Sequence, residues 1–131
     1  MGHVVRALFF LLIALGALAT TARAQSFQVS GHAGVLGEWE LNATVTPTVS
    51  QSAKKFSGPL TMKHVGLCTQ DGPEEKTGEI RIQISGSSSR MKAILLFDGV
   101  ECVYSGRFTN SYTGMMNCPD RRAVPLTLWV K

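Results

Sequence analysis

From residue 38 onward, polar and apolar side chains along the chain alternate with a period of two. Residues 38–45 alternate without a break and place four side chains on one face: Trp39, Leu41, Ala43 and Val45. Residues 79–84 repeat the pattern with three isoleucines, and residues 56–67 and 124–130 repeat it more weakly. This period is typical of antiparallel strands with one buried face and one wet face.

Turn signals separate these stretches. Asp98-Gly99 is the sharpest of them, because this pair suits the two positive-φ positions of a type I′ hairpin. Residues 71–76 contain an acidic run with Gly72-Pro73, and we expect them to form a solvated loop. Residues 91–97 have helical spacing over two turns, but they run directly into Asp98-Gly99, so we interpret them as a strand. The pattern predicts an all-β chain, a single small antiparallel meander barrel or sandwich of about seven to eight strands.

The first residues have a different character. Residues 1–6 are weakly basic, residues 7–19 are apolar, and Ala22-Arg23-Ala24 supplies the small residues that a signal peptidase requires. We expect a signal peptide over residues 1–24, with cleavage before Gln25; an uncleaved membrane anchor is the alternative. Residues 25–36 are predicted to be a loose lead-in, with a short strand around Phe27 and Val29. Residues 37–131 then form the β domain.

Removal of the leader changes the charge balance. The remaining 107 residues carry 11 basic and 9 acidic side chains, so the basic character of the whole chain is a weak argument for nucleic acid. No Lys/Arg cluster with interleaved aromatic residues supports such a partner either. We therefore expect a secreted protein of the bacterial periplasm, with no stable membrane span after cleavage and no nucleic-acid partner.

Gly37-Glu38-Trp39 opens the first long strand. This G-x-W resembles the motif that opens the barrel of calycins, the group that contains lipocalins, avidins and some secreted bacterial protease inhibitors. The resemblance covers three residues. It implies a barrel in which Trp39 plugs one end, and it carries over no binding residue.

Turn geometry predicts where two of the three cysteines lie. A two-residue turn at Asp98-Gly99 sets Cys102 on the strand that leads away from it. If the next loop is the odd-numbered Thr109-Asn110-Ser111, then Tyr104 pairs with Met116 and Cys102 falls opposite Cys118. Directly opposed residues lie close enough for a disulfide. We expect Cys102–Cys118 to be the structural bridge.

The third cysteine leaves alternatives open. Cys68 follows a strand that ends at the same side of the sheet, so a bridge from Cys68 to Cys102 or Cys118 competes with the favoured one. Three thiolates with His64 or Asp120 would also suit zinc. The chain has no C-x-x-C or H-x-x-x-H spacing, however, and an oxidising compartment favours disulfides. We predict no metal site and no cofactor.

The candidate binding residues come from one predicted face. Gly106 and Gly114 would lie opposite each other, which either bends the sheet or opens a pocket. The pocket would be lined by large side chains: Trp39, Tyr104, Phe108, Tyr112 and Met116. His64 is expected to be a strand-end histidine with one satisfied hydrogen bond.

No catalytic constellation is present, because no G-x-S-x-G or H-E-x-x-H occurs and the three histidines have no candidate nucleophile beside them. We therefore do not expect an enzyme. The sequence predicts an exported small β-barrel binding or interaction protein that takes a small apolar ligand. The alternative is an envelope component or secreted protease inhibitor that binds a protein through its loops.

Overall fold

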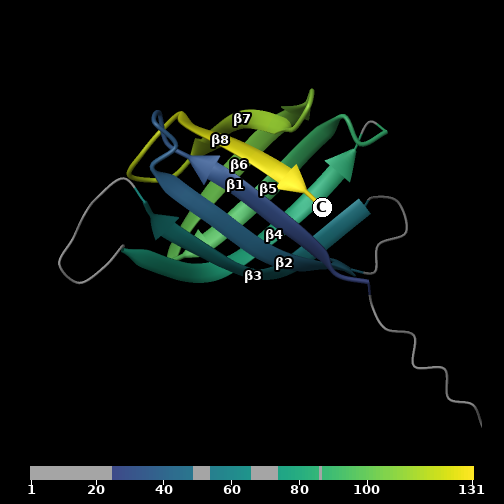
Figure 1. Cartoon of the computed structure of the whole chain (residues 1–131), viewed down its shortest axis with the longest axis horizontal. Coiled ribbons are helices and arrows are strands. Elements are labelled where there is room, and N and C mark those ends of the chain that lie inside the picture. Colours follow the sequence, from purple (N-terminus) through teal and green to yellow (C-terminus); the bar gives the residue numbers. More distant parts are fainter. Residues whose placement is uncertain (1–24, 49–53, 66–73, 86) are drawn as a thin grey trace, which may run out of the picture.

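The protein is a closed barrel of eight antiparallel strands (Figure 1). The computed structural model describes residues 25–48, 54–65, 74–85 and 87–131. Every strand pairs with its neighbours in sequence, and the first pairs with the last. The strands are β1 (Phe27–Ala33), β2 (Trp39–Thr48), β3 (Lys54–His64), β4 (Glu75–Ser85), β5 (Arg90–Phe97), β6 (Val100–Phe108), β7 (Tyr112–Asn117) and β8 (Val124–Val130). The predicted all-β fold is confirmed, in its barrel form.

Strand β1 closes the barrel. It pairs with β2 on one side and with β8 on the other, so that Gly31 lies between Leu41 and Leu128. The prediction of a loose lead-in over residues 25–36 is therefore wrong, although the short strand suspected around Phe27 and Val29 is there. The local signal is weak because the segment is short and contains glycine. Two neighbouring strands supply the hydrogen bonds that make it a strand.

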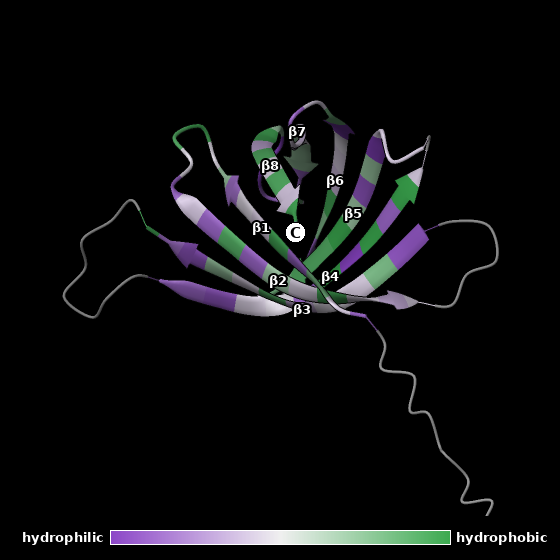
Figure 2. Cartoon of the chain, turned by 45° about the vertical axis from the view of Figure 1, so that its right-hand side comes forward, coloured by the Kyte–Doolittle hydropathy of each residue, from purple (hydrophilic) through white to green (hydrophobic). Residues whose placement is uncertain are grey.

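Hydrophobic and hydrophilic residues alternate along the strands (Figure 2). The apolar side chains of one face are buried and form the core inside the barrel. Strand β5 contributes Met91, Ala93 and Leu95, which confirms the strand interpretation over the helical one. A barrel of about eight strands is just wide enough for side chains to fill it. The most deeply buried large side chains are Tyr104, Leu41, Leu60, Ile80, Met91, Leu95, Leu126 and Leu128.

Both hairpins that flank β6 follow the predicted register. Asp98 and Gly99 have φ of 52° and 70°, and Phe97 faces Val100 across the two-residue turn. At the other end of β6, Phe108 faces Tyr112 across the predicted three-residue loop. The register of β6 and β7 is therefore the odd-loop register.

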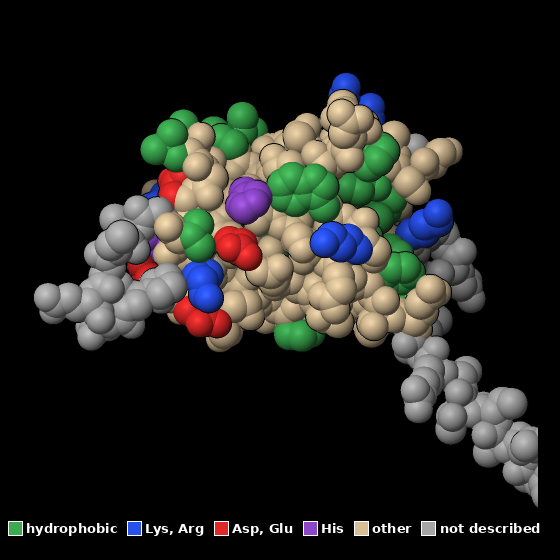
Figure 3. Space-filling view, viewed as in Figure 1, with side chains coloured by type: hydrophobic (Ala, Val, Ile, Leu, Met, Phe, Trp, Pro, Cys, Tyr) green, Lys and Arg blue, Asp and Glu red, His purple; other side chains and the backbone are tan. Residues whose placement is uncertain are grey.

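The barrel has two ends, which we name by their connections. The mouth end, at the left in Figure 1, carries the connections at residues 34–38, 98–99 and 118–123. The far end carries the start of β1, the loop at residues 109–111 and the end of β8. On the face seen in Figure 3, acidic side chains gather towards the mouth end. Within the described residues, no helix is long and apolar enough to cross a membrane.

Candidate binding site at the barrel mouth

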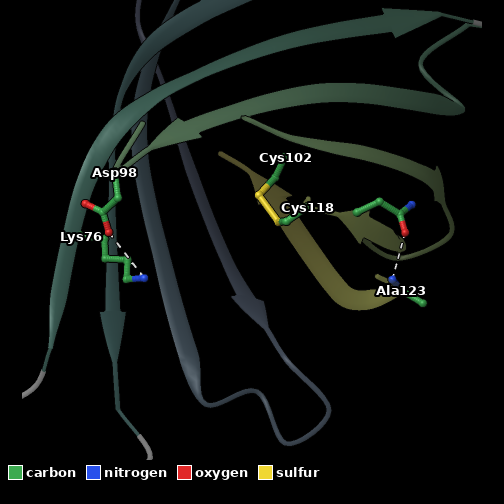
Figure 4. The surroundings of a disulfide bond; sticks show 6 residues. Lys76, Asp98, Cys102, Cys118 and Ala123 are labelled. Carbon is green, nitrogen blue, oxygen red and sulfur yellow. Dashed lines mark hydrogen bonds and ion pairs between the residues drawn. A yellow bond between two sulfur atoms is a disulfide. The ribbon is translucent and has the colours of Figure 1, made fainter. Parts of the chain in front are cut away.

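A disulfide joins the two strands at one side of the mouth (Figure 4). Cys102 in β6 and Cys118 just after β7 are bridged, with 4.3 Å between their Cα atoms. The predicted Cys102–Cys118 pairing is therefore the one observed. Cys68 lies outside the described residues, so its competing pairings stay untested. A disulfide is consistent with an oxidising, exported environment.

The connection from β7 to β8 is folded back on itself beside the disulfide. The Cys118 amide donates to the Arg121 carbonyl at 2.7 Å, and the Asn117 side-chain oxygen accepts from the Ala123 amide at 2.9 Å (Figure 4). Ala123 has a positive φ of 56°, a conformation that such contacts must hold in place. These bonds fix residues 118–123 at the rim, so that Asp120 and Arg121 border the mouth cavity.

Lys76 is a charged residue on the inner face of the barrel. Its ammonium lies 3.5 Å from the Asp98 carboxylate, and it stands 5.4 Å from the ring centre of Trp39 and 5.9 Å from that of Phe97. An ammonium over aromatic faces is attracted by the ring quadrupoles. Glu75 and Lys76 belong to β4, so the prediction of a solvated loop over residues 71–76 is wrong for them, while residues 71–73 lie outside the described residues.

The alternation of β4 carries the signal that would have placed Lys76. Ile82 and Ile80 point inward, and the same parity continues through Gly78 to Lys76. The acidic run and the Gly-Pro pair obscured this, because turn residues lie immediately before the strand begins.

Trp39 begins β2 at the mouth, opposite His64 at the end of β3. The two rings lie 4.6 Å apart between centres. His64 is a strand-end histidine, as expected, but its Nδ1 is buried and has no hydrogen-bond partner among the described residues. Trp39 therefore lies close to both the His64 ring and the Lys76 ammonium.

A cavity of about 210 Å³ opens at the mouth. Its apolar lining comes from the inner faces of seven strands and from the disulfide: Ala33, Trp39, Met62, Phe97, Val100, Met116 and Val124, with Cys102 and Cys118. Its charged lining consists of four carboxylates and two cations: Glu38, Glu74, Asp98 and Asp120, with Lys76 and Arg121. The cavity thus has apolar walls and a polar rim with an excess of negative charge.

The mouth cavity takes in two of the five residues predicted to bind a ligand. Trp39 and Met116 line it. Tyr104 is fully buried inside the barrel, Tyr112 is 5% exposed, and Phe108 is 52% exposed at the far end. Phe108 and Tyr112 lie together, with 5.1 Å between ring centres. The five residues are therefore divided between the mouth, the interior and the far end.

The glycines opposite each other do not open a pocket. A Cβ on Gly106 would overlap the Tyr104 hydroxyl, so the Tyr104 ring already occupies that space. A Cβ on Gly114 would overlap the Ser105 carbonyl oxygen of β6. Close approach of neighbouring backbones at glycine is what a tightly curved sheet needs.

The two tyrosines are packing residues with protonated hydroxyls. Burial, and secondarily the neighbouring Tyr112, raises the pKa of Tyr104 to about 12. Burial also raises the pKa of Tyr112, whose hydroxyl donates to the Ser88 carbonyl at 2.7 Å. The Tyr104 hydroxyl has no hydrogen-bond partner among the described residues.

A rigid turn with two exposed apolar side chains borders the mouth. Val35 is 84% exposed and Leu36 is 91% exposed. The Gly34 amide donates to the Pro125 carbonyl at 2.9 Å, the Gly37 amide to the Gly34 carbonyl at 3.1 Å, and the Leu36 amide to the Glu38 carboxylate at 3.0 Å. These three bonds hold the turn in one shape.

The fold and the mouth define the class of the protein as a closed eight-stranded antiparallel barrel with a cavity of about 210 Å³ at its mouth end. This architecture is consistent with a calycin-like barrel. Comparison of the chain with known protein families, with characterised proteins and with solved structures finds no significant match in any of the three. Among the described residues, no group of three or more His, Cys, Asp or Glu side chains is arranged to hold a metal ion.

Proposed function

We propose that the protein is an exported, calycin-like binding protein that holds a small amphipathic ligand in the mouth cavity. The observation that carries this proposal is the cavity itself, which joins an apolar wall at Trp39, Met62 and Met116 to a charged rim. Core side chains fill the middle of the barrel, and the apolar hollow at the far end measures only about 70 Å³, so the ligand sits at the mouth and does not extend along the barrel axis. Export follows from the expected signal peptide and agrees with the disulfide.

The cavity volume limits the apolar part of the ligand. An engineered apolar cavity of about 150 Å³ binds benzene. A cavity of about 210 Å³ therefore suits a single ring or a short branched chain. A long acyl chain exceeds it.

The rim selects the polar part of the ligand. Four carboxylates face two cations there, and Lys76 already has Asp98 as a partner. The surplus negative charge favours an ammonium or a neutral polar group over a carboxylate or phosphate. Trp39 and Phe97 add aromatic faces, which also favour a cation.

The fluorescence of Trp39 tests the proposal. The chain has two tryptophans, so a Trp129→Phe variant leaves Trp39 as the single reporter at the mouth. Benzylamine, benzyl alcohol and phenylacetate are matched in size and differ in charge. We expect saturable quenching by benzylamine, and at least about fivefold weaker binding of phenylacetate, a difference of about 1 kcal/mol.

A cavity-filling variant supplies the control. Val124→Phe places a ring in the mouth cavity, whereas Val103→Phe adds the same ring on the outer face of β6. Binding should be lost in the first variant and kept in the second, with both folded by near-ultraviolet circular dichroism. Unchanged binding in folded Val124→Phe, or equal affinity for all three probes, would contradict the proposal.

A protein partner is the second candidate function, and the turn at residues 34–37 favours it. A turn held by three hydrogen bonds presents Val35 and Leu36 to solvent, which lowers the cost of ordering its backbone on binding. Exposed apolar side chains of this kind mark interaction sites. The native chain should capture an envelope partner or a target protease, and the Val35→Ser/Leu36→Ser variant should not. If the variant captures the same protein as the native chain, this turn is not the contact.

A further inference from the structure

Charge is segregated along the barrel axis. The eight side-chain carboxylates of the described residues all lie on the mouth half: Glu38, Glu40, Glu74, Glu75, Glu79, Asp98, Glu101 and Asp120. The far half carries basic side chains, and none of the described side-chain carboxylates lies there. Figure 3 shows acidic side chains on one face gathered towards the mouth end, while basic ones lie at both ends. Without its leader the chain is only weakly basic. The charge division therefore comes from where the charged side chains lie and not from the net charge.

Five of these cations form one surface, which we call the basic wall: Lys55, Arg81, Arg90, Lys92 and Arg107. All five are exposed and stand on the outward face of four adjacent strands, β3 to β6. The register sets Lys55 level with Gln83 and Lys92. Neighbouring strands lie about 4.8 Å apart, so the wall spans roughly 15 Å across the sheet.

Four of the five cations have no acidic partner. Arg81 is paired with Glu79 at 3.3 Å, at the boundary with the mouth half. The other four make no ion pair within the described residues. Arg90 and Arg107 are directly opposed across β5 and β6. Like charges in directly opposed positions repel each other, and a bound anion would reduce this repulsion.

The wall is also hollowed and partly apolar. A groove of about 430 Å³ lies between Lys55, Arg81 and Lys92, with Ile94 and Val103 beside them and no carboxylate in its lining. Val103 and Met115 are each 51% exposed. Met115 lies level with Lys92 across the sheet, because Lys92 pairs with Ser105 and Ser105 pairs with Met115. The hollow therefore combines cations at its edge with apolar side chains next to them.

We propose that the basic wall docks on an anionic phospholipid surface, with a headgroup phosphate in the hollow between Lys55, Arg81 and Lys92. A membrane surface suits the wall because its cations are spread over four strands and do not converge on one point. Basic side chains interleaved with apolar ones are the usual make-up of an interfacial contact. The acidic mouth end is repelled by the same surface, which leaves the mouth cavity open to the aqueous side.

Vesicle co-sedimentation tests the proposal with a chain that starts at Gln25, since residues 25–131 contain all eight strands. The vesicles are phosphatidylcholine alone or mixed with phosphatidylglycerol, at low and high salt. Each cation at an anionic surface contributes about fivefold to partitioning. We expect binding to the anionic vesicles, weakening with salt, and a loss of about 30-fold in Lys92→Gln/Arg107→Gln.

A matched control separates placement from net charge. Lys63→Gln/Arg122→Gln removes two exposed cations at the mouth end, and it should bind within about threefold of the native chain. Urea midpoints establish that both variants are folded. Equal binding to neutral vesicles, equal losses in the two variants, or no vesicle binding at all would each overturn the proposal. So would a wall-dependent dimer, or tighter wall-dependent binding of duplex DNA, because either assigns the wall to another partner. The wall and the mouth share no residue, so this result is independent of the ligand test.

Discussion

Replacement of Tyr104 by phenylalanine should stabilise the protein, although Tyr104 is among the most deeply buried residues of the core. Its hydroxyl is buried against Gly106 without a partner among the described residues. A buried hydroxyl without a hydrogen bond costs about 1–3 kcal/mol by mutational measures. Loss of one oxygen leaves a void of only about 10 Å³, which costs about 0.2 kcal/mol. The expected net gain is about 1 kcal/mol or more.

Tyr112→Phe is the matched variant with the opposite sign. Tyr112 is nearly as buried, but its hydroxyl donates to the Ser88 carbonyl at 2.7 Å. Removal of that donor leaves the carbonyl unpaired, so we expect a loss of about 1–2 kcal/mol. The two variants delete the same atom from the same residue type and should differ by about 2–3 kcal/mol.

Urea unfolding followed by tryptophan fluorescence, with the disulfide intact, measures both changes. In thermal melts, Tyr104→Phe should raise the midpoint by about 4 °C or more for a domain of this size. A destabilisation of Tyr104→Phe similar to that of Tyr112→Phe would refute the reasoning. It would mean that the Tyr104 hydroxyl has a hydrogen-bond partner in the folded protein.

Three further outcomes are expected. Cys102→Ala/Cys118→Ala should lower the free energy of unfolding in urea by about 3 kcal/mol, because the bridge closes a loop with a sequence separation of 16. An unchanged urea midpoint would mean that the bridge does not stabilise the fold. Gly58→Ala should lower the free energy of unfolding by more than about 3 kcal/mol, because its Cβ would overlap the Thr44 carbonyl oxygen. Gly99→Ala should lower it by only about 1 kcal/mol, because the site is open and only the φ of 70° is unfavourable. Equal losses would contradict the close packing of β2 on β3. In Tyr112→Phe, Tyr104 is the only tyrosine left, and its ultraviolet titration should still have a midpoint above the ordinary value of about 10, because burial is the larger cause of its raised pKa and only the smaller contribution of Tyr112 is removed. Because that folded-state pKa lies above the unfolded value of about 10, the stability it contributes is complete below pH 10. It is lost as pH rises from 10 through the folded-state pKa, by about 1.4 kcal/mol per pH unit; a midpoint near 10 would contradict the burial of Tyr104.

Much of the fold could be predicted because its signals are local. Asp98-Gly99 dictates a two-residue turn, and the position of apolar residues around Thr109-Asn110-Ser111 dictates an odd loop. These two turns were enough to bring Cys102 opposite Cys118. A register error of one residue would have put the two sulfur atoms on opposite faces of the sheet.

The site was harder to predict, because it depends on what fills the barrel. Tyr104 and Met116 are neighbours in the register, yet Tyr104 lies in the packed interior and Met116 at the hollow mouth. Lys76 was assigned to a loop although its parity with Ile80 places it on the inner face. Phe97 and Met62, which line the mouth, have nothing in their local sequence that distinguishes them from other core residues.

By itself, the sequence determined the strands, their facing and the pairing of neighbours, since period two and turn chemistry act over a few residues. Only the tertiary structure decided that β1 closes the barrel against β8, because that pairing joins residues about a hundred positions apart. Closure in turn brings Trp39, Lys76 and Met116 around one cavity, and it gathers the acidic side chains of the described residues at the mouth end. These arrangements belong to the closed sheet, because each strand contributes only one or two of the residues that make them.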